Sequence, residues 1–363
     1  MVRYNHSMSY LRHNPLSIFI LALPLAILAK FLGWAPFWIF TFSALGVIPM
    51  ASYIGEATEA LAAHTNPKIG GLLNATLGNA AELIITIVAI REGLLELVKA
   101  SITGSILGNL LLVLGFSFLL GGLRNGLQKF DRRNASRNAI LLILTVLALL
   151  IPSLLSHYIG PETSLRVETF NLGVAGVMLL LYILALVYSF GAEGAPLTHE
   201  PIKDIEYKTK WSLRIAILIL AVATIAVVFL SEILVGAVVP VVDSLGVSEF
   251  FLGIILIPII GNVAEHLVSV KMAYINKMNL SVEIAIASSL QIALFVAPVL
   301  VFVSLLIGHP LQLIFNQFEL LALIAGVLIT ALASADGESN WLEGVELLAL
   351  YLILGLAFFL LPV

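Results

Sequence analysis

The sequence predicts an all-α membrane protein of eleven transmembrane helices, with one extra N-terminal helix followed by two inverted five-helix repeats. Hydrophobic residues make up 60% of the chain, charged residues make up 11%, and the mean hydropathy is +1.08. The apolar runs continue for about 20 residues, the length that a helix needs to cross a bilayer, and do not alternate with period two as barrel strands do. In addition, a five-residue motif occurs once in each half.

Eleven apolar runs, separated by short segments with Gly, Pro, Asn or charge, are the expected spans. The extra N-terminal helix lies near 16–33 and lacks the small-residue cleavage site of a signal peptide. The helices of the first repeat lie near 36–62, 69–91, 97–121, 138–157 and 169–190. Those of the second repeat lie near 211–238, 249–275, 280–307, 318–334 and 341–361.

The chain should therefore divide into four segments. They are the tail and extra helix (1–35), the first repeat (36–192), a polar linker of mixed charge (193–210) and the second repeat (211–363). We interpret the linker as a solvated connection. Because each repeat has an odd number of helices, the two repeats must be inserted with opposite orientations.

Basic residues predict the orientation of the chain. With the N-terminus inside, the inner loops and adjoining span ends collect 14 of the 18 Lys and Arg residues, so we expect a cytoplasmic N-terminus and an external C-terminus. The short tails favour a prokaryotic plasma membrane. A net charge of -4 selects no partner beyond the lipid bilayer, nucleic acid is not expected, and the absence of cysteine excludes thiolate sites and disulfides.

The repeated motif is Gly-Asn-Ala-Ala-Glu at 78–82 and Gly-Asn-Val-Ala-Glu at 261–265. A charged side chain in hydrocarbon costs about 3 kcal/mol or more, so such a residue usually serves function. Asn79 and Glu82 are three residues apart and share a helix face, as do Asn262 and Glu265. We expect Gly78 and Gly261, with Pro258 before the second copy, to loosen their helices.

Further polar residues recur at matched distances. Ser105 lies 23 residues after Glu82, and Ser289 lies 24 residues after Glu265, close to Gln291. One span upstream, Thr58-Glu59 resembles Ser231-Glu232. Inverted repeats are a common plan of secondary transporters, whose binding site lies near the bilayer midplane between the halves. The duplicated polar residues are therefore predicted to converge.

The chemistry of these residues favours a hard cation. All the ligands are oxygens, which calcium prefers, whereas zinc or copper would recruit histidine or cysteine, and magnesium demands stricter octahedral geometry. Burial favours the protonated form of a carboxyl group and a nearby dication favours the ionised form. Protons and metal should thus compete for Glu82 and Glu265, and one dication or two protons would neutralise the pair.

At this point the sequence resembles the calcium/proton exchangers, the cation/H+ exchanger family of the calcium:cation antiporter superfamily. The resemblance covers essentially the whole chain and rests on GNAAELI at 78–84, GNVAEH at 261–266, SSLQIA at 288–293 and DGESNWLEG at 336–344. It implies an antiporter that exchanges Ca2+ for protons by alternating access, with no cofactor. Central ion and proton ligands would be Glu82 and Glu265, and the same site would be lined by Asn79, Asn262, Ser105, Ser289 and Gln291.

Other acidic and basic groups are secondary candidates. Glu56, Glu59 and Glu232 could admit protons or be solvated at span ends, and His266 could relay protons or pack against its neighbours. A ligand role is favoured for the asparagines over bridging neighbouring helices, whereas the serines could equally serve to let helices approach closely.

Three other classes of function fit the sequence less well. A sodium/calcium exchanger on the same scaffold would place more acidic ligands after each motif, where this chain has Ser105 and Ser289. A cation channel fits two carboxylates in unequal halves less well than alternating access does. An enzyme is not expected, because no hydrolase or phosphate-binding motif occurs. Selectivity among divalent ions and homo-oligomer formation stay open.

Overall fold

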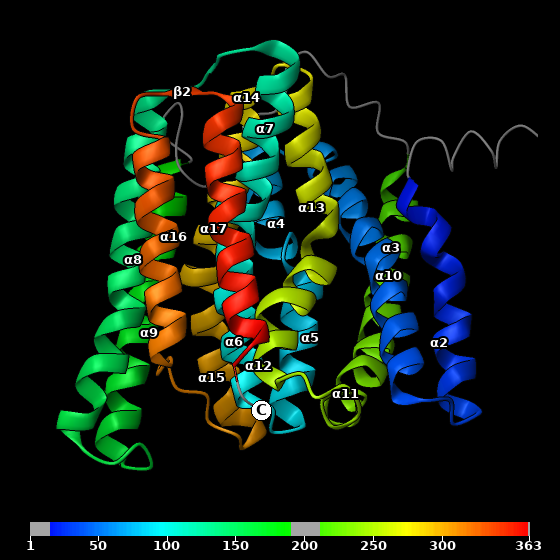
Figure 1. Cartoon of the computed structure of the whole chain (residues 1–363). Coiled ribbons are helices and arrows are strands. Elements are labelled where there is room, and N and C mark those ends of the chain that lie inside the picture. The colour runs from blue at the N-terminus through cyan, green and yellow to red at the C-terminus, as the bar shows by residue number, and fades with distance from the viewer. Residues whose placement is uncertain (1–14, 190–210, 362–363) are drawn as a thin grey trace, which may run out of the picture.

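A computed structural model describes residues 15–189 and 211–361 of the chain, which form a bundle of long helices (Figure 1). The linker expected at 193–210 and most of the N-terminal tail lie outside the described residues.

The first half of the chain contains helices of very different length. They are η1 (Pro15–Leu21), α2 (Ala22–Phe31), α3 (Pro36–Ala63), α4 (Pro67–Leu77), α5 (Ala80–Arg91), α6 (Leu95–Leu107), η2 (Gly108–Val113), α7 (Leu114–Asn125), α8 (Arg132–Ile159) and α9 (Leu165–Ser189), with a short strand β1 (Gln128–Lys129) before α8. α6, η2 and α7 run on as one rod, Leu95–Asn125, with a π-helical turn in the middle.

The second half of the chain is helical as well. It contains α10 (Leu213–Gly236), α11 (Val238–Leu245), α12 (Glu249–Phe251), η3 (Leu252–Leu256), α13 (Ile257–Tyr274), α14 (Met278–Gln291), η4 (Ile292–Val296), α15 (Ala297–Ile307), α16 (Gln317–Ala333), the strand β2 (Glu338–Ser339) and α17 (Trp341–Phe359). η3 and η4 are π-helical, like η2. Single π-helical turns inside α-helices are frequent at functional sites.

The described residues contain eight helices long and apolar enough to cross a membrane. Ile69–Leu77 and Ala80–Arg91 form a bent pair that makes nine if it is one span. Two shorter apolar helices, Leu16–Phe31 and Gln317–Ala333, occupy the places of the first and tenth expected spans. The chain is thus a helical integral membrane protein, as predicted, while length alone does not establish eleven spans.

The two ends of the bundle are built differently. At one end β1 pairs antiparallel with β2, with Gln128 opposite Ser339 and Lys129 opposite Glu338. This end, at the top of Figure 1, is called the β end below. The opposite end holds the start of α6 and the connection between α15 and α16, and is called the far end.

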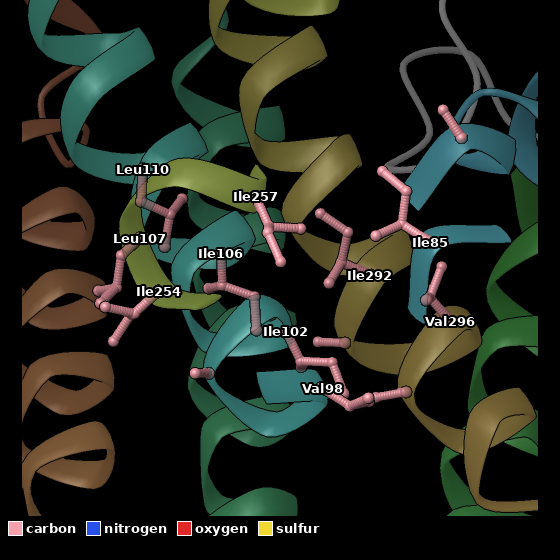
Figure 2. Packing of buried hydrophobic residues seen from close by; sticks show 14 of the residues in the cluster. Ile85, Val98, Ile102, Ile106, Leu107, Leu110, Ile254, Ile257, Ile292 and Val296 are labelled. Carbon is pink, nitrogen blue, oxygen red and sulfur yellow. The ribbon is translucent and has the colours of Figure 1, made fainter. Parts of the chain in front are cut away.

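The helices around the centre pack at very short range where α6 crosses η3. A Cβ built on Gly104 would lie 2.7 Å from the Ile254 Cα, and one on Gly253 would lie 2.9 Å from the Leu97 carbonyl oxygen. Real side chains do not tolerate such contacts, so the crossing requires glycine. Apolar side chains fill the space beside it, including Ile102 and Ile106 (Figure 2).

Candidate ion-binding site

The first copy of the motif lies at a break between two helices. α4 ends at Leu77 and α5 begins at Ala80, with a bend of 41° between them. Asn79, within the break, has φ -95° and ψ 22°, which is not helical. Glu82 therefore stands in the first turn of α5. Free N–H groups and the helix dipole favour a negative charge in this position.

The second copy lies inside a continuous helix. α13 runs from Ile257 to Tyr274, so Glu265 is in its interior. Pro258 is in the first turn, where its missing N–H costs no hydrogen bond. The loosening expected around Pro258 and Gly261 is found earlier in the chain, in the π-helical turn η3. The two copies thus share a sequence but not a backbone conformation.

Glu82 is buried, with 1% of its surface exposed, and both carboxyl oxygens accept hydrogen bonds. The Ser105 hydroxyl of α6 donates to Oε1. The Asn262 amide of α13 donates to Oε2 at 3.3 Å and to the Ser105 Oγ at 3.4 Å. One partner comes from the same half of the chain and the other from the second motif.

Glu265 stands in a second polar cluster. The Ser288 hydroxyl of α14 donates to its Oε2 at 2.9 Å, and the Asn109 amide of η2 donates to the Ser288 Oγ at 3.0 Å. The Asn79 amide donates to the Gln291 Oε1 at 2.9 Å, while the Asn79 Oδ1 lies 3.5 Å from the Ser288 hydroxyl. Here too, residues of both halves share one cluster.

The glycines of the motif bring the two clusters together. A Cβ built on Gly78 would lie 3.1 Å from the Glu265 Oε1, and one built on Gly261 would lie 3.7 Å from the Glu82 Cβ. Each motif glycine therefore faces the glutamate of the other motif. Because glycine has no side chain, the two helices approach closely enough for both carboxyl groups to lie in one polar interior.

The two carboxyl groups differ in their access to solvent. Glu82 is buried, whereas Glu265 and Gly78 are partly exposed. Leu73, Asn74 and Leu77 of α4 are partly exposed as well. Glu265 and these residues of α4 thus retain some accessible surface, whereas Glu82 has almost none.

The structure changes the serine assignment in the second half. The Ser289 hydroxyl donates to the Ala285 carbonyl of its own helix at 3.0 Å, and Ser288 is the residue that contacts Glu265. Equal spacing was the signal in the sequence, since Ser105 and Ser288 both follow their glutamate by 23 residues. Asn109, four residues after Ser105, was not predicted either, because no asparagine lies four residues after Ser288 in the second half.

The secondary candidates include groups at the surface and one buried ring. Glu232, at the far end, forms an ion pair with Arg91 of α5 at 3.1 Å, and both side chains are exposed. Glu56 is partly buried and Glu59 is exposed on α3. The buried His266 Nε2 has no hydrogen-bond partner among the described residues. The Glu232 ion pair therefore does not connect this carboxyl group to the centre.

The donor set of the centre is made of oxygen and amide groups. Within residues 15–189 and 211–361, no three His, Cys, Asp or Glu side chains are grouped so that they could hold a metal ion. A cation at this centre would therefore rely on two carboxylates plus hydroxyl and amide oxygens, which suits a hard ion. Hydroxyl and amide donors now occupy the same carboxyl oxygens, so a cation would have to displace them.

Known proteins are similar to this chain over nearly its whole length. The family model described as sodium/calcium exchanger protein matches residues 35–191 and 215–360. A Ca(2+)/H(+) antiporter of Aphanothece halophytica is 44% identical over 360 residues, covering 95% of this chain and 96% of that protein. The solved structure of native YfkE superimposes with a TM-score of 0.83 at 40% identity, covering 95% of this chain and 99% of that one. The sodium-calcium exchanger NCX_Mj shares the fold, with a TM-score of 0.53 at 19% identity and coverage of 86% and 95%.

Proposed function

From the premise that this chain belongs to the sodium/calcium exchanger protein family, we propose that it is a secondary antiporter exchanging Ca2+ for protons. The similarity to a Ca(2+)/H(+) antiporter over nearly the full length of both chains supports this activity. The observation that carries the proposal is the meeting of Glu82 and Glu265, one from each half, among hydroxyl and amide groups.

Exchange follows from competition for the two carboxyl groups. Moving net charge through hydrocarbon is costly, so the centre crosses most readily when it is neutral. One Ca2+ or two protons would achieve this equally. Protons arriving from one side would therefore displace the ion, and the released carboxylates would then bind Ca2+ from the other side.

We propose Glu82, Glu265, Asn79, Asn262, Ser105 and Gln291 as ion ligands, together with Ser288 and Asn109. Ser288 takes the role expected of Ser289, whose hydroxyl is bonded within its own helix. Proton binding is assigned to the two glutamates. Glu56, Glu59, Glu232 and His266 stay a secondary proposal for the pathway by which protons enter.

The proposed architecture is the inverted repeat of five helices. The eight long spans, the bent pair as one span and the two shorter helices together give eleven. The first repeat would occupy 36–192 and the second 211–363, joined by the linker at 193–210. By the charge of its loops, the β end would be cytoplasmic, and the exchanger would lie in a prokaryotic plasma membrane.

The sodium/calcium exchanger is the weaker alternative. The solved sodium-calcium exchanger NCX_Mj shares only the fold with this chain, at 19% identity. The residues beside the two glutamates, Ser105 and Ser288, are neutral, so the centre has two carboxylates. That number suits two protons better than a set of sodium sites. A channel would need an open pore between the ends, whereas Glu82 is buried.

The decisive experiment is flux in proteoliposomes with a calcium indicator and a pH indicator read together. We expect an imposed pH gradient to drive Ca2+ uptake and Ca2+ to drive counterflow of protons. A sodium gradient should have no effect. Ca2+ flux that moves no protons, or that responds to sodium alone, would overturn the proposal.

A further inference from the structure

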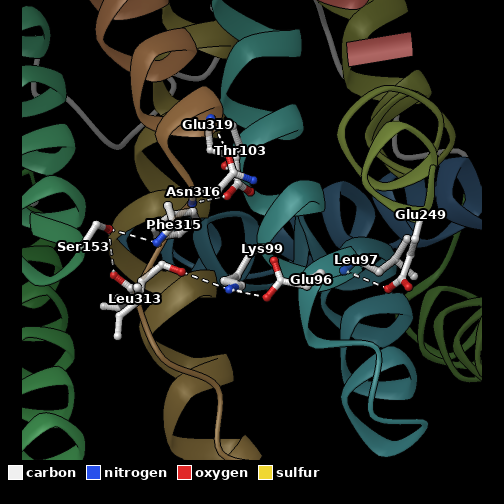
Figure 3. Close-up of polar contacts among 11 residues, drawn as sticks. Glu96, Leu97, Lys99, Thr103, Ser153, Glu249, Leu313, Phe315, Asn316 and Glu319 are labelled. Atoms are coloured by element: carbon white, nitrogen blue, oxygen red, sulfur yellow. Dashed lines mark hydrogen bonds and ion pairs between the residues drawn. The ribbon is translucent and has the colours of Figure 1, made fainter. Parts of the chain in front are cut away.

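A further buried polar cluster, distinct from those around Glu82 and Glu265, lies at the far end of the bundle. It involves α6, the same helix that supplies Ser105. Lys99 of α6 forms an ion pair with Glu96 at 2.6 Å, and its ammonium group donates to the Ile314 carbonyl at 3.0 Å (Figure 3). The Glu96 side chain is 62% exposed and that of Lys99 only 15%. A positive charge is therefore held just beneath the surface, between α6 and the chain that leads into α16.

Glu319, in the first turn of α16, is fully buried. Its Oε2 accepts from the Asn316 N–H at 2.8 Å, which completes a capping box. Its Oε1 accepts from the Thr103 hydroxyl of α6 at 3.4 Å (Figure 3). The cap needs only one oxygen, and a glutamine would serve it equally. The capping box therefore does not explain why residue 319 has a second carboxyl oxygen or why its side chain can carry a charge.

Glu343 provides the comparison within the same chain. It occupies the same position of a capping box in α17, where the Asn340 N–H donates to its Oε2 at 3.1 Å. Glu343 is partly exposed, and its capping box involves no residue of α6. A cap alone therefore does not require a carboxyl group buried against α6.

The charged groups acting on Glu319 are Lys99 and Glu96, both from α6. α8 also packs against α16, and there its Ser153 accepts from the Phe315 N–H at 2.9 Å. No charged group of α8 or α17 contributes to the surroundings of Glu319 among the described residues. Because the charges of Lys99 and Glu96 cancel, the net charge of this cluster depends on whether Glu319 is protonated.

α6 separates this cluster from the central site. Thr103 contacts Glu319 and Ser105, two residues later, contacts Glu82. Positions two apart on a helix point to nearly opposite sides, so Glu319 and Glu82 face each other across about one helix diameter, roughly 12 Å. Little water lies between them to screen a charge, because α6 is buried over this stretch.

We propose that Glu319 is a proton-sensing residue whose negative charge strengthens Ca2+ binding at the centre and whose protonation from the far end weakens it. This inference rests on the function proposed above and adds a third carboxyl group to its regulation. On the proposed orientation the far end is external. Acid outside would thereby assist release of the ion on the side where protons arrive.

Equilibrium binding of 45Ca2+ to the purified full-length protein tests this. A unit charge acting on a dication over roughly 12 Å, at an effective dielectric constant of about 20, changes the affinity about a hundredfold. Glu319→Gln should raise the Ca2+ dissociation constant by about that factor near pH 8, and the difference should vanish near pH 5. Glu343→Gln should leave binding unchanged at both pH values.

Lys99→Gln should change the Ca2+ affinity in the opposite direction, and it distinguishes an effect of charge from a structural defect. Removing the positive charge should tighten Ca2+ binding, whereas a structural defect would weaken it. Weaker binding in both variants, or a Glu319→Gln effect that does not change with pH, would overturn the inference. If Glu319→Gln does not fold, Lys99→Gln decides whether charge in this cluster acts on the centre, and unchanged Ca2+ binding in Lys99→Gln would overturn the inference. A wild-type protein without proton-competed Ca2+ binding would instead refute the proposed function.

Discussion

The two copies of the motif have nearly the same sequence and very different surroundings. Glu82 begins a helix after a 41° bend, is 1% exposed and accepts from two residues. Glu265 lies inside a continuous helix, is partly exposed and accepts from Ser288. In the inverted-repeat architecture proposed above, a single conformation cannot present both halves equally to the two sides of a membrane. The difference between the copies is what alternating access requires of one state.

The largest effect on transport is expected from replacing either glutamate, and the two replacements test directly how the copies of the motif differ. Glu82→Gln and Glu265→Gln should each lower Ca2+ transport more than about 100-fold, because an amide does not titrate and lacks the negative charge that balances a dication. The stabilities should differ. In Glu82→Gln, one of the two accepting oxygens becomes an NH2 group, so a buried hydrogen bond from Ser105 or Asn262 must be reversed or lost, which costs about 1–3 kcal/mol if it is lost, whereas Glu265 is partly exposed.

Flux assays and thermal unfolding of both variants test this pair. Wild-type exchange in either variant would contradict the shared site. Equal losses of stability would contradict the difference in burial.

The next effect concerns the crossing of α6, from the first half of the chain, with η3, from the second half. Gly104 follows Glu82 by 22 residues, and Ala287 follows Glu265 by the same 22. Gly104→Ala would press a methyl group onto Ile254 and should destabilise the fold by about 2 kcal/mol or more. Gly108→Ala is the control, since nothing lies within 4 Å of its Cβ position. Folded yield and unfolding temperature measure both, and equal behaviour would show that the crossing is loose.

A smaller effect should separate neighbouring serines. Ser288→Ala removes a hydroxyl oxygen that lies beside Glu265 and is proposed as an ion ligand, so it should weaken Ca2+ binding by about tenfold, the lower end for one hydrogen bond to a charged group. Ser105→Ala, its counterpart beside Glu82, should behave alike. Ser289→Ala should have little effect because its hydroxyl is bonded to Ala285. If Ser289→Ala were the more harmful variant, the assignment of Ser288 would be wrong.

The smallest effect is expected at the surface. The Arg91–Glu232 ion pair joins α5 to α10 at the far end, and both side chains are exposed. Water screens such exposed pairs and they contribute little to stability, so Glu232→Gln should change the transport rate less than about threefold. Arg91→Gln should match it. A large loss confined to Glu232→Gln would assign the carboxyl group to the proton pathway instead.

Much of the site could be predicted because its residues are repeated. Glu82 and Glu265 were found as charges in apolar runs, and Asn79 and Asn262 by their spacing from them. Ser288 was missed by one position, since a serine at 288 and one at 289 look alike until the helix rotation is known. Glu319 was not singled out, because a glutamate at the start of a helix is common and only its contact with Thr103 distinguishes it.

The sequence by itself determined the solvent, the helical class and the pair of carboxyl groups, because hydropathy, helical period and repetition are properties of the chain alone. Only the tertiary structure decided which glycine faces which glutamate, which serine donates and how deeply each carboxyl group is buried. Those outcomes depend on how α5, α6, α13 and α14 cross. A shift of one residue turns a side chain on a helix by about 100 degrees, and no local pattern records that rotation.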